Sequence, residues 1–370
     1  MKSRIIIIVS VILLAGTLSA FQKKESVRFY KGNMHTHSYW SDGNTYPEEV
    51  ARWYSDHGYH FLAITDHNLI QKGIRYRVSG KDSVRLKELT DLSKEFDKKD
   101  EFLLVQSEEI TDAAEKRPVH LNGFNLSQVV KPTGGATVSE CLNSNVVAIR
   151  QALEVDGNPE WISVNHPNFG WGLTSKDLAE CGARFFEVFN GHPSVHNYGD
   201  SVHPGTETMW DQANKWRVDH NEKLLLGTAT DDAHQYDKYE TGKANPGRGW
   251  VMVRASELTP AALYQAMMNA DFYASTGVEL EDFKVHKMTM TIRIKPIKGV
   301  HYTTEFIGWM HGQDHAEVLA TVSGTKAVYT GTGKELFVRA RIISDKDKAN
   351  PFVWGDKEMA WVEPFTPGEK

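Results

Sequence analysis

The feature that most constrains the fold is a pattern that recurs through the first 280 residues, in which a short apolar run ends in histidine or carboxylate residues. Runs of this length are typical of buried strands. The runs end at Asp66 and His67, at Glu108 and Glu109, at His120, at His166, and at Asp231, Asp232 and His234. Helical stretches separate most of them, around 45–58, 84–97, 139–154, 174–181 and 206–222. Alternating strands and helices predict parallel βαβ units, with the polar residues gathered at the C-terminal mouth of a barrel.

The stretch 32–43 supplies the first candidate metal ligands. If it is extended, His35 and His37 point to the same side, so both imidazoles can reach one cation. Asp42 precedes Gly43, and this turn-forming pair can bend a carboxylate back toward the same point. Two histidines often occur by chance on an exposed strand, so this stretch indicates a metal site only together with the recurring pattern.

Helix signals follow in two places. Thr45 and Glu48 have the spacing of a capping box, and Thr174 predicts the start of another helix. The segment between His234 and Gly249 has no periodicity, and we expect a mobile loop over the mouth.

The pattern changes beyond residue 280. The segments 288–294 and 336–342 alternate strictly between apolar and polar residues, and helical patterns stop. We therefore expect an α/β barrel in residues 21–279 and a small all-β, sandwich-like domain in residues 280–370.

The N-terminus has the order of a secretory signal. Lys2 and Arg4 precede the apolar run 5–14, and small residues follow it. We expect residues 1–20 to be removed and the mature chain to be periplasmic or secreted. An uncleaved anchor is the alternative, because Leu18 fits a cleavage site imperfectly, but the run is short for a membrane span.

Charge and cysteine content limit the partners. The net charge of −6 and the absence of a long Lys/Arg run disfavour nucleic acid, so we expect a small-molecule substrate. Cys141 and Cys181 are the two cysteines, and export would permit a disulfide between them. Two buried free thiols are an equally good interpretation. The oligomeric state is left open.

The motifs together resemble the PHP (polymerase and histidinol phosphatase) superfamily of metallohydrolases over residues 33–277. They are His35-x-His37, Asp42-Gly43, Thr65-Asp66-His67-Asn68, Glu109-Ile110-Thr111, His120-Leu121-Asn122, Asn165-His166-Pro167 and Asp232-Ala233-His234. The resemblance implies a distorted (β/α)7, TIM-like barrel that holds up to three divalent metal ions.

The resemblance also implies three ligand sets. The first is His35, His37, Glu109 and Asp232; the second is Glu109, His120 and His166; the third is Asp42, His67 and His234. Glu108 competes with Glu109 for the bridging position. The family's acid directly precedes an Ile-Thr pair, and this favours Glu109.

This ligand chemistry suits a hydrolase. A carboxylate shared by two cations holds them about 3.5–4 Å apart, which allows a bridging hydroxide to attack a phosphate ester. Mixed imidazole and carboxylate ligands suit Zn, Mn or Fe. The leading hypothesis is a phosphoesterase or phosphatase acting on a small phosphorylated molecule. An ester, carbamate or amide hydrolase is the first alternative, and a binding protein that docks glycan or cell-wall polymer through its β domain is the second.

Four residues around the ligands have more than one interpretation. Besides Glu109 and Asp232, His192 and Arg248 are candidate catalytic residues that could hold a phosphate or protonate a leaving oxygen, although a solvated loop position would also explain them. Asp66 and Asp231 could each orient a ligand imidazole or cap a loop.

Overall fold

The computed structural model describes residues 27–368. The predicted signal peptide, residues 1–20, lies outside the described residues. Within the described part of the chain, no helix is long and apolar enough to cross a membrane.

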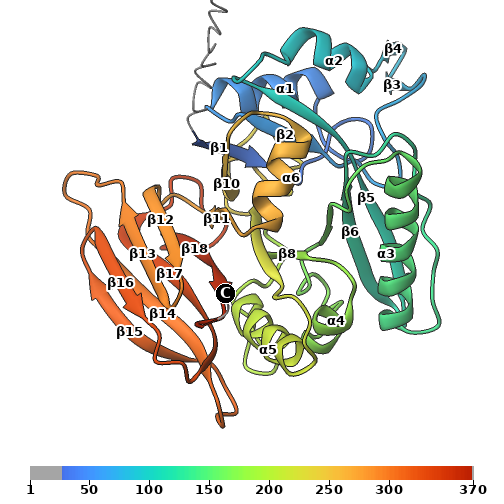
Figure 1. Ribbon diagram of the computed structural model, residues 1–370. Helices are drawn as coiled ribbons and strands as arrows, with labels where there is room; N and C mark the ends of the chain where they lie inside the picture. Colours follow the sequence, from blue (N-terminus) through green and yellow to red (C-terminus); the bar gives the residue numbers. More distant parts are fainter. Residues whose placement is uncertain (1–26, 369–370) are drawn as a thin grey trace, which may run out of the picture.

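Helices and strands alternate up to residue 268, and strands alone follow (Figure 1). The helices are α1 (Pro47–Asp56), α2 (Leu89–Phe96), α3 (Val138–Val155), α4 (Ser175–Glu180), α5 (Thr206–Asp219) and α6 (Pro260–Met268). The strands up to residue 275 are β1 (Arg28–Asn33), β2 (Phe61–Ile64), β3 (Tyr76–Ser79), β4 (Asp82–Arg85), β5 (Leu103–Ala114), β6 (Arg117–Phe124), β7 (Ile162–Val164), β8 (Phe185–Asn190), β9 (Leu226–Thr230), β10 (Trp250–Ala255) and β11 (Phe272–Ser275). The later strands are β12 (Leu280–His286), β13 (Thr289–Ile294), β14 (Tyr302–Met310), β15 (Glu317–Ser323), β16 (Lys326–Thr330), β17 (Glu335–Asp347) and β18 (Lys357–Phe365).

Seven neighbouring strands position the site. They lie in the order β1-β2-β5-β6-β7-β8-β9 within a larger sheet. Just beyond the ends of β1 and β9, Thr36 and Ala233 form a parallel bridge, and the backbone N–H of His37 donates to the carbonyl oxygen of Ala233. The first and last strands of the series therefore meet again at the end where the ligand motifs lie.

One strand departs from the predicted parallel arrangement. β6 runs antiparallel to both β5 and β7, whereas β1–β2, β2–β5, β7–β8 and β8–β9 are parallel pairs. Glu115 and Lys116, both at positive φ, form the whole connection between β5 and β6. A two-residue turn of this kind joins only antiparallel neighbours, so no crossover helix fits between them.

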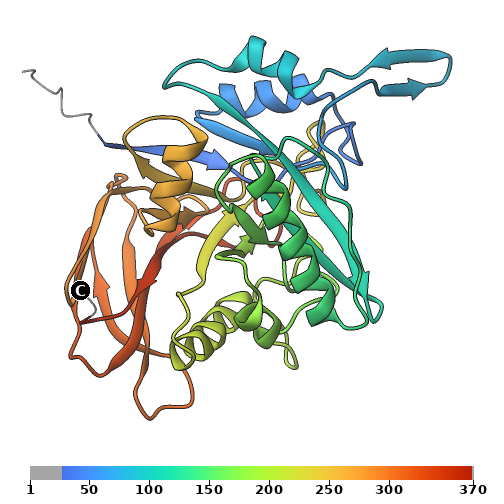
Figure 2. The ribbon, with the colours of Figure 1, turned by 45° about the vertical axis from the view of Figure 1, so that its right-hand side comes forward.

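Helices pack around this sheet and form its main core. α3 lies along β5 and β6, as Figures 1 and 2 both show, and its buried residues Leu142, Val146 and Ile149 belong to the same apolar cluster as Val119 and Leu121 of β6. The predicted cap at Thr174 is confirmed, because its side chain and that of Asp177 form a capping box.

Two predicted helix starts are wrong. No side chain caps α1, whose N-cap is Tyr46 rather than Thr45, and Pro47 occupies the first helical position, where its missing N–H needs no partner. The region from residue 84 contains β4 instead of helix, and α2 begins at Leu89. β3 and β4 form a hairpin that projects from the body (Figure 2).

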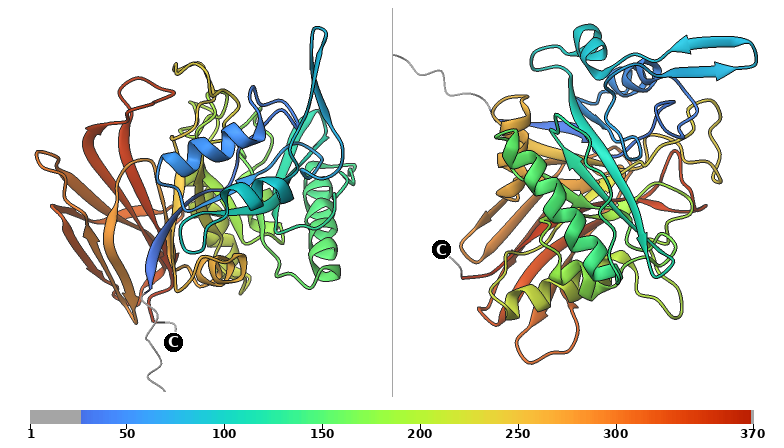
Figure 3. Two further views of the ribbon diagram at one scale, coloured as in Figure 1. Left: turned by 90° about the horizontal axis from the view of Figure 1, so that it is seen from above. Right: turned by 90° about the vertical axis from the view of Figure 1, so that its right-hand side faces the viewer.

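The C-terminal strands continue the same sheet. β18 pairs antiparallel with β11, and β17, β14 and β15 follow it outward. A second sheet of β12, β13 and β16 faces them (Figure 3). Ile292 of one sheet and Ile342 of the other belong to one apolar cluster. Because β11 precedes residue 280, the hydrogen-bonded sheet crosses the predicted domain boundary.

Cys141 and Cys181 are both buried free thiols, so the interpretation without a disulfide holds.

Candidate metal centre

Four ligand atoms converge where β1 ends. Nε2 of His35 lies 3.4 Å from Oε2 of Glu109 and 3.3 Å from Oδ1 of Asp232. Nε2 of His37 lies 3.5 Å and 3.1 Å from the same two oxygens. Four atoms bound tetrahedrally at the usual Zn–N and Zn–O distances lie roughly 3.3–3.6 Å apart. The spacing therefore fits one four-coordinate cation and is the first ligand set that the sequence resemblance implies.

One of these atoms has no other partner. Among residues 27–368, no atom forms a hydrogen bond with the buried Nε2 of His35, whereas Oε2 of Glu109 also has Nδ1 of His67 2.8 Å away. Buried polar atoms are nearly always satisfied, so an unsatisfied imidazole nitrogen facing two carboxylate oxygens indicates a position for a cation. The residues present therefore fit a divalent metal ion.

Glu109 has the geometry of a bridging carboxylate. Its Oε2 belongs to the first set, while its Oε1 lies 3.1 Å from Nδ1 of His120 and 3.2 Å from Nε2 of His166. The side-chain amide of Asn165 donates to the same Oε1 over 2.9 Å and fixes the rotation of the carboxylate. One side chain thus presents one oxygen to each of two ligand sets.

Glu108 faces the other way. Its Oε2 accepts a hydrogen bond from the backbone N–H of Val130, 2.8 Å away, and burial raises its pKa to about 7. Adjacent side chains of a strand point to opposite faces, so only one of the two glutamates reaches the mouth.

A third group of ligands lies at the open side of the site. Oδ1 of Asp42 is 3.5 Å from Nε2 of His67 and 3.3 Å from Nε2 of His234. His37 also approaches this group, with its Nδ1 3.8 Å from Asp42. The Asp42 side chain is 59% exposed, whereas Glu109 is fully buried, so this group is the one nearest solvent.

Charges inside the site are strongly coupled. Burial alone would lower the pKa of His67, but the carboxylates of Glu109 and Asp42 raise it to about 11. Burial and two neighbouring imidazoles lower the pKa of His37 to about 3. Although burial opposes it, the surrounding imidazoles hold the pKa of Glu109 and of Asp232 well below its usual range. The centre therefore keeps its carboxylates ionised, as cation ligands must be.

The three groups border one cleft of about 320 Å³. Phe169, His192 and Gln235 complete its wall beside the ligands. The backbone N–H of Ser194 donates to Nδ1 of His192 over 3.1 Å, which places the imidazole proton of the neutral ring on Nε2.

Sequence reasoning missed one residue of this site, Glu187. Its Oε1 lies 2.7 Å from Nδ1 of His35 and accepts a hydrogen bond from Oγ1 of Thr230. Its Oε2 accepts from the backbone N–H of His166 and from the side chain of Asn190. The only signal in the sequence was a charged residue in the middle of an apolar strand, between Phe186 and Val188.

Asp66 and Asp231 act on loops. Asp66 accepts hydrogen bonds from Ser38, Ser41 and Gln71, and so shapes the turn that carries Asp42. Asp231 accepts from the hydroxyl of Tyr54 and from three consecutive backbone N–H groups at 247–249. For both aspartates, the contacts fit the interpretation that the residue caps a loop and not the one in which it orients a ligand imidazole.

Arg248 is a buried structural residue here. Its guanidinium donates to the carbonyl oxygens of Gly191, Glu240 and Asn350 and also contacts that of Lys243. These bonds tie the segment 234–249, expected to be a mobile loop, to the neighbouring chain. The guanidinium is therefore engaged by backbone and not directed at a phosphate, which differs from the predicted role.

Of the comparisons with known proteins, only the comparison with solved structures found matches. No family model matches the sequence, and no curated protein matches it. A two-domain protein from Bacteroides vulgatus, described as containing a predicted PHP-like metal-dependent phosphoesterase, is 17% identical, with 93% of this chain and 96% of that chain covered and a TM-score of 0.46. An amidohydrolase from Chromobacterium violaceum is 15% identical, with 55% of this chain and 87% of that chain covered and a TM-score of 0.30.

Because both proteins are so distant in sequence, the ligand geometry of this chain is the basis for inferring its chemistry.

Proposed function

We propose that this chain is a metal-dependent phosphoesterase that hydrolyses a small phosphorylated molecule. Residues 21–279 would form a distorted seven-stranded barrel with two or three divalent cations at its mouth, and residues 280–370 a sandwich-like domain. The observation that carries the proposal is the position of Glu109, whose two carboxylate oxygens face two separate imidazole sets.

Each part of the cleft has a role in this reaction. Divalent cations bound there would lower the pKa of a shared water molecule and offset the negative charge of a phosphoryl group. Glu109 would supply one carboxylate oxygen to each of the two buried ligand sets, and Asp232 would supply one to the first. The Nε2 proton of His192 is available to donate a hydrogen bond to a phosphoryl oxygen at the cleft wall.

Cleft size supports a small substrate. About 320 Å³ lies at the lower end of the range for pockets that enclose small ligands. The ligand types suit Zn, Mn or Fe better than Ca, which prefers an all-oxygen shell.

A substrate panel tests the reaction class. Purified protein loaded in turn with Zn, Mn or Fe is assayed on phosphomonoesters, phosphodiesters, carboxylate esters, carbamates and amides of matched leaving group. We expect phosphate esters to be turned over at least about 100-fold faster than the acyl substrates. Turnover of acyl substrates alone would assign the alternative hydrolase class, and metal binding without any turnover would favour the binding protein.

We also propose that the chain is exported, on the order of charged, apolar and small residues in 1–20. N-terminal sequencing of the protein from cell fractions should find a start near Phe21 or Gln22 outside the cytoplasm. An intact Met1 in the cytoplasmic fraction would contradict this.

A further inference from the structure

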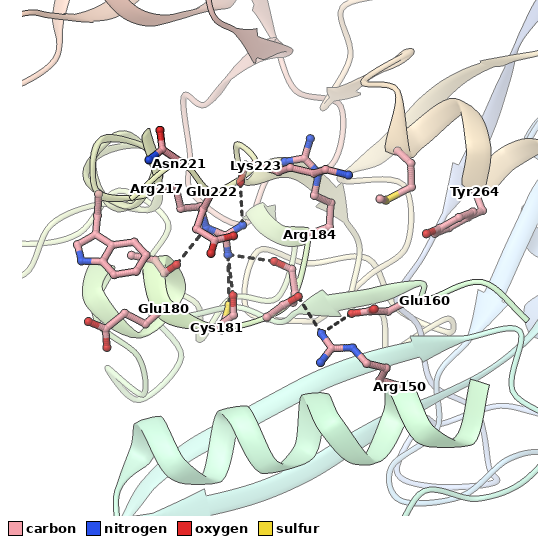
Figure 4. A pocket seen from close by; sticks show the side chains of 15 residues that line it. Arg150, Glu160, Glu180, Cys181, Arg184, Arg217, Asn221, Glu222, Lys223 and Tyr264 are labelled. Atoms are coloured by element: carbon pink, nitrogen blue, oxygen red, sulfur yellow. Dashed lines mark hydrogen bonds and ion pairs between the residues drawn. The ribbon is translucent and has the colours of Figure 1, made fainter. Parts of the chain in front are cut away.

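A second cavity lies at the opposite end of the strands from the metal centre. It has a volume of about 490 Å³ and is lined by the segments that precede β7, β8 and β9, together with α6 (Figure 4). Arg184 immediately precedes β8, whereas Asn190 at the other end of β8 contacts Asp232 of the metal centre. The cavity is therefore separate from the catalytic cleft.

Two other arginines of this cavity have partners within the fold. Arg150 pairs with Glu160 over 2.7 Å. Arg217 directs its guanidinium at five backbone carbonyl oxygens, those of Leu178, Ala179, Cys181, Ala183 and Lys223 (Figure 4). Both side chains stabilise the cavity wall and leave little for a ligand.

Arg184 is the exception. Its Nε and Nη1 atoms are buried, and no atom of residues 27–368 accepts a hydrogen bond from them. Nor does any carboxylate in that part of the chain form an ion pair with its guanidinium. The buried carboxyl of Glu363 interacts electrostatically with Arg184 but forms no ion pair with it, and burial raises the pKa of Glu363 well above its usual range. Arg184 itself is half-buried, and two buried, unpartnered donors on a cation are costly unless an anion compensates them.

The other residues that line the cavity indicate which groups a ligand would have besides its anionic group. Tyr264 and Met268 offer apolar surface, and Arg184 and Met268 also border an adjoining cavity of about 450 Å³. At the rim the exposed Glu222 and Lys223 carry opposite charges. Arg184 thus provides one positive charge that has no ion-pair partner among residues 27–368, inside an otherwise balanced, partly apolar cavity.

We propose that this cavity binds a small molecule with one oxyanion group, a carboxylate or a phosphate, held by Arg184, with its apolar part against Tyr264 and Met268. The site is independent of the metal centre and of the reaction proposed for it. Nη2 of the guanidinium forms one paired edge with Nε and another with Nη1, and either edge matches the paired oxygens of a carboxylate or a phosphate.

Binding to the full-length chain is measured by calorimetry and by the fluorescence of Trp216, which lines the cavity. The probes are phenylacetate, phenylphosphonate, inorganic phosphate and the neutral analogue 2-phenylethanol. Phenylphosphonate has a carbon–phosphorus bond that a phosphoesterase does not cleave. We expect one equivalent of an aromatic anion per chain and binding of 2-phenylethanol at least about tenfold weaker. Whichever of phenylacetate and phenylphosphonate binds more tightly identifies the anionic group of the ligand as a carboxylate or a phosphate.

Variants locate the binding site. Arg184→Met should weaken binding about tenfold or more, and Arg184→Lys should weaken it less, because the charge remains while the paired donors are lost. Lys223→Met, at an exposed rim position, should weaken binding about two- to threefold. The matched control, Arg52→Met, removes an exposed arginine of α1 and should have no effect.

Three outcomes would overturn the proposal: no binding of any anion, equal binding of 2-phenylethanol, or wild-type affinity in Arg184→Met. Binding that depends on metal loading and is unchanged in Arg184→Met would place the anion at the metal centre instead. If Arg184→Met does not fold, the anion affinities of Arg184→Lys and Lys223→Met test the proposal in its place. Wild-type affinity in both variants would contradict it.

Discussion

Oε1 of Glu187 lies 2.7 Å from Nδ1 of His35, and this contact decides which imidazole nitrogen faces the metal centre. With the proton held on Nδ1 by the buried carboxylate, Nε2 presents its lone pair toward Glu109 and Asp232. Carboxylates in this position orient metal-binding imidazoles and raise their basicity. Glu187 is thus a positioning residue for a ligand that lies 152 positions away in the sequence.

We predict that Glu187→Gln lowers metal affinity about 10- to 100-fold, because the amide can still accept the hydrogen bond but no longer carries the charge. The measurement is competition with a chelator, read as metal retained per chain. Glu101→Gln, which changes an exposed acid, is the matched control and should retain metal as the wild type does. Equal retention in both variants would show that Glu187 only packs the core.

His192 should act on substrate and not on metal. Because its Nδ1 accepts a hydrogen bond from Ser194, its Nε2 proton is free at the cleft wall. We predict that His192→Ala keeps its metal and lowers kcat/KM about 100-fold, the usual cost of losing one donor to a developing anion. The loss should be the same for phosphate esters with good and poor leaving groups. A loss confined to poor leaving groups would make His192 a proton donor instead.

Arg339 joins the C-terminal sheet to the helical layer. The guanidinium is buried and pairs with Asp211 and Glu207 of α5 over 2.7 Å each. We predict that Arg339→Met lowers the free energy of unfolding by about 3–5 kcal/mol, because the buried Asp211 loses its partner and Glu207 keeps only Arg341. Denaturant titration measures this. Arg293→Met removes an exposed pair and should cost about 0–1 kcal/mol; equal effects would contradict the role of Arg339.

Glu335 predicts a pH dependence of stability. Although burial opposes it, hydrogen bonds from Tyr329 and the turn at Thr332 lower its pKa to about 2, from an ordinary value of 4.5. A lowered carboxyl pKa stabilises the fold above pH 4.5, and that contribution is lost as the pH falls toward 2. Glu335→Gln should therefore be less stable than wild type at pH 7, with the difference shrinking below pH 4.5. A difference that does not change with pH would contradict this.

Several metal ligands, such as His67, His166 and Asp232, could be predicted from sequence because they follow short apolar runs, and parallel strands bring their ends to one edge. Glu109 and His120 were also expected at strand ends, but they lie inside β5 and the antiparallel β6. His35, His67, Glu109, His166 and Asp232 are far apart in the chain, yet the structure places them around one centre. The choice of Glu109 over Glu108 followed from strand alternation and from the Ile-Thr pair that follows it.

Contacts that depend on tertiary structure could not be predicted in this way. Nothing local distinguishes Arg248, which bonds to backbone, from an arginine that binds phosphate. The antiparallel direction of β6 depends on the two-residue turn at Glu115 and Lys116, a pair without the Gly or Asn usual in such turns. The pairing of β18 with β11 links segments more than 80 residues apart, and no periodicity encodes it.

Elemental analysis of Glu109→Gln beside Glu108→Gln, under identical metal supply, tests the central claim most directly. We predict that wild type and Glu108→Gln both bind two to three equivalents of divalent metal per chain. Glu109→Gln should lose metal from both sets that share its carboxylate, and its phosphatase rate should fall by at least about 100-fold. Full metal content and activity in Glu109→Gln, or loss of metal in Glu108→Gln alone, would contradict the account.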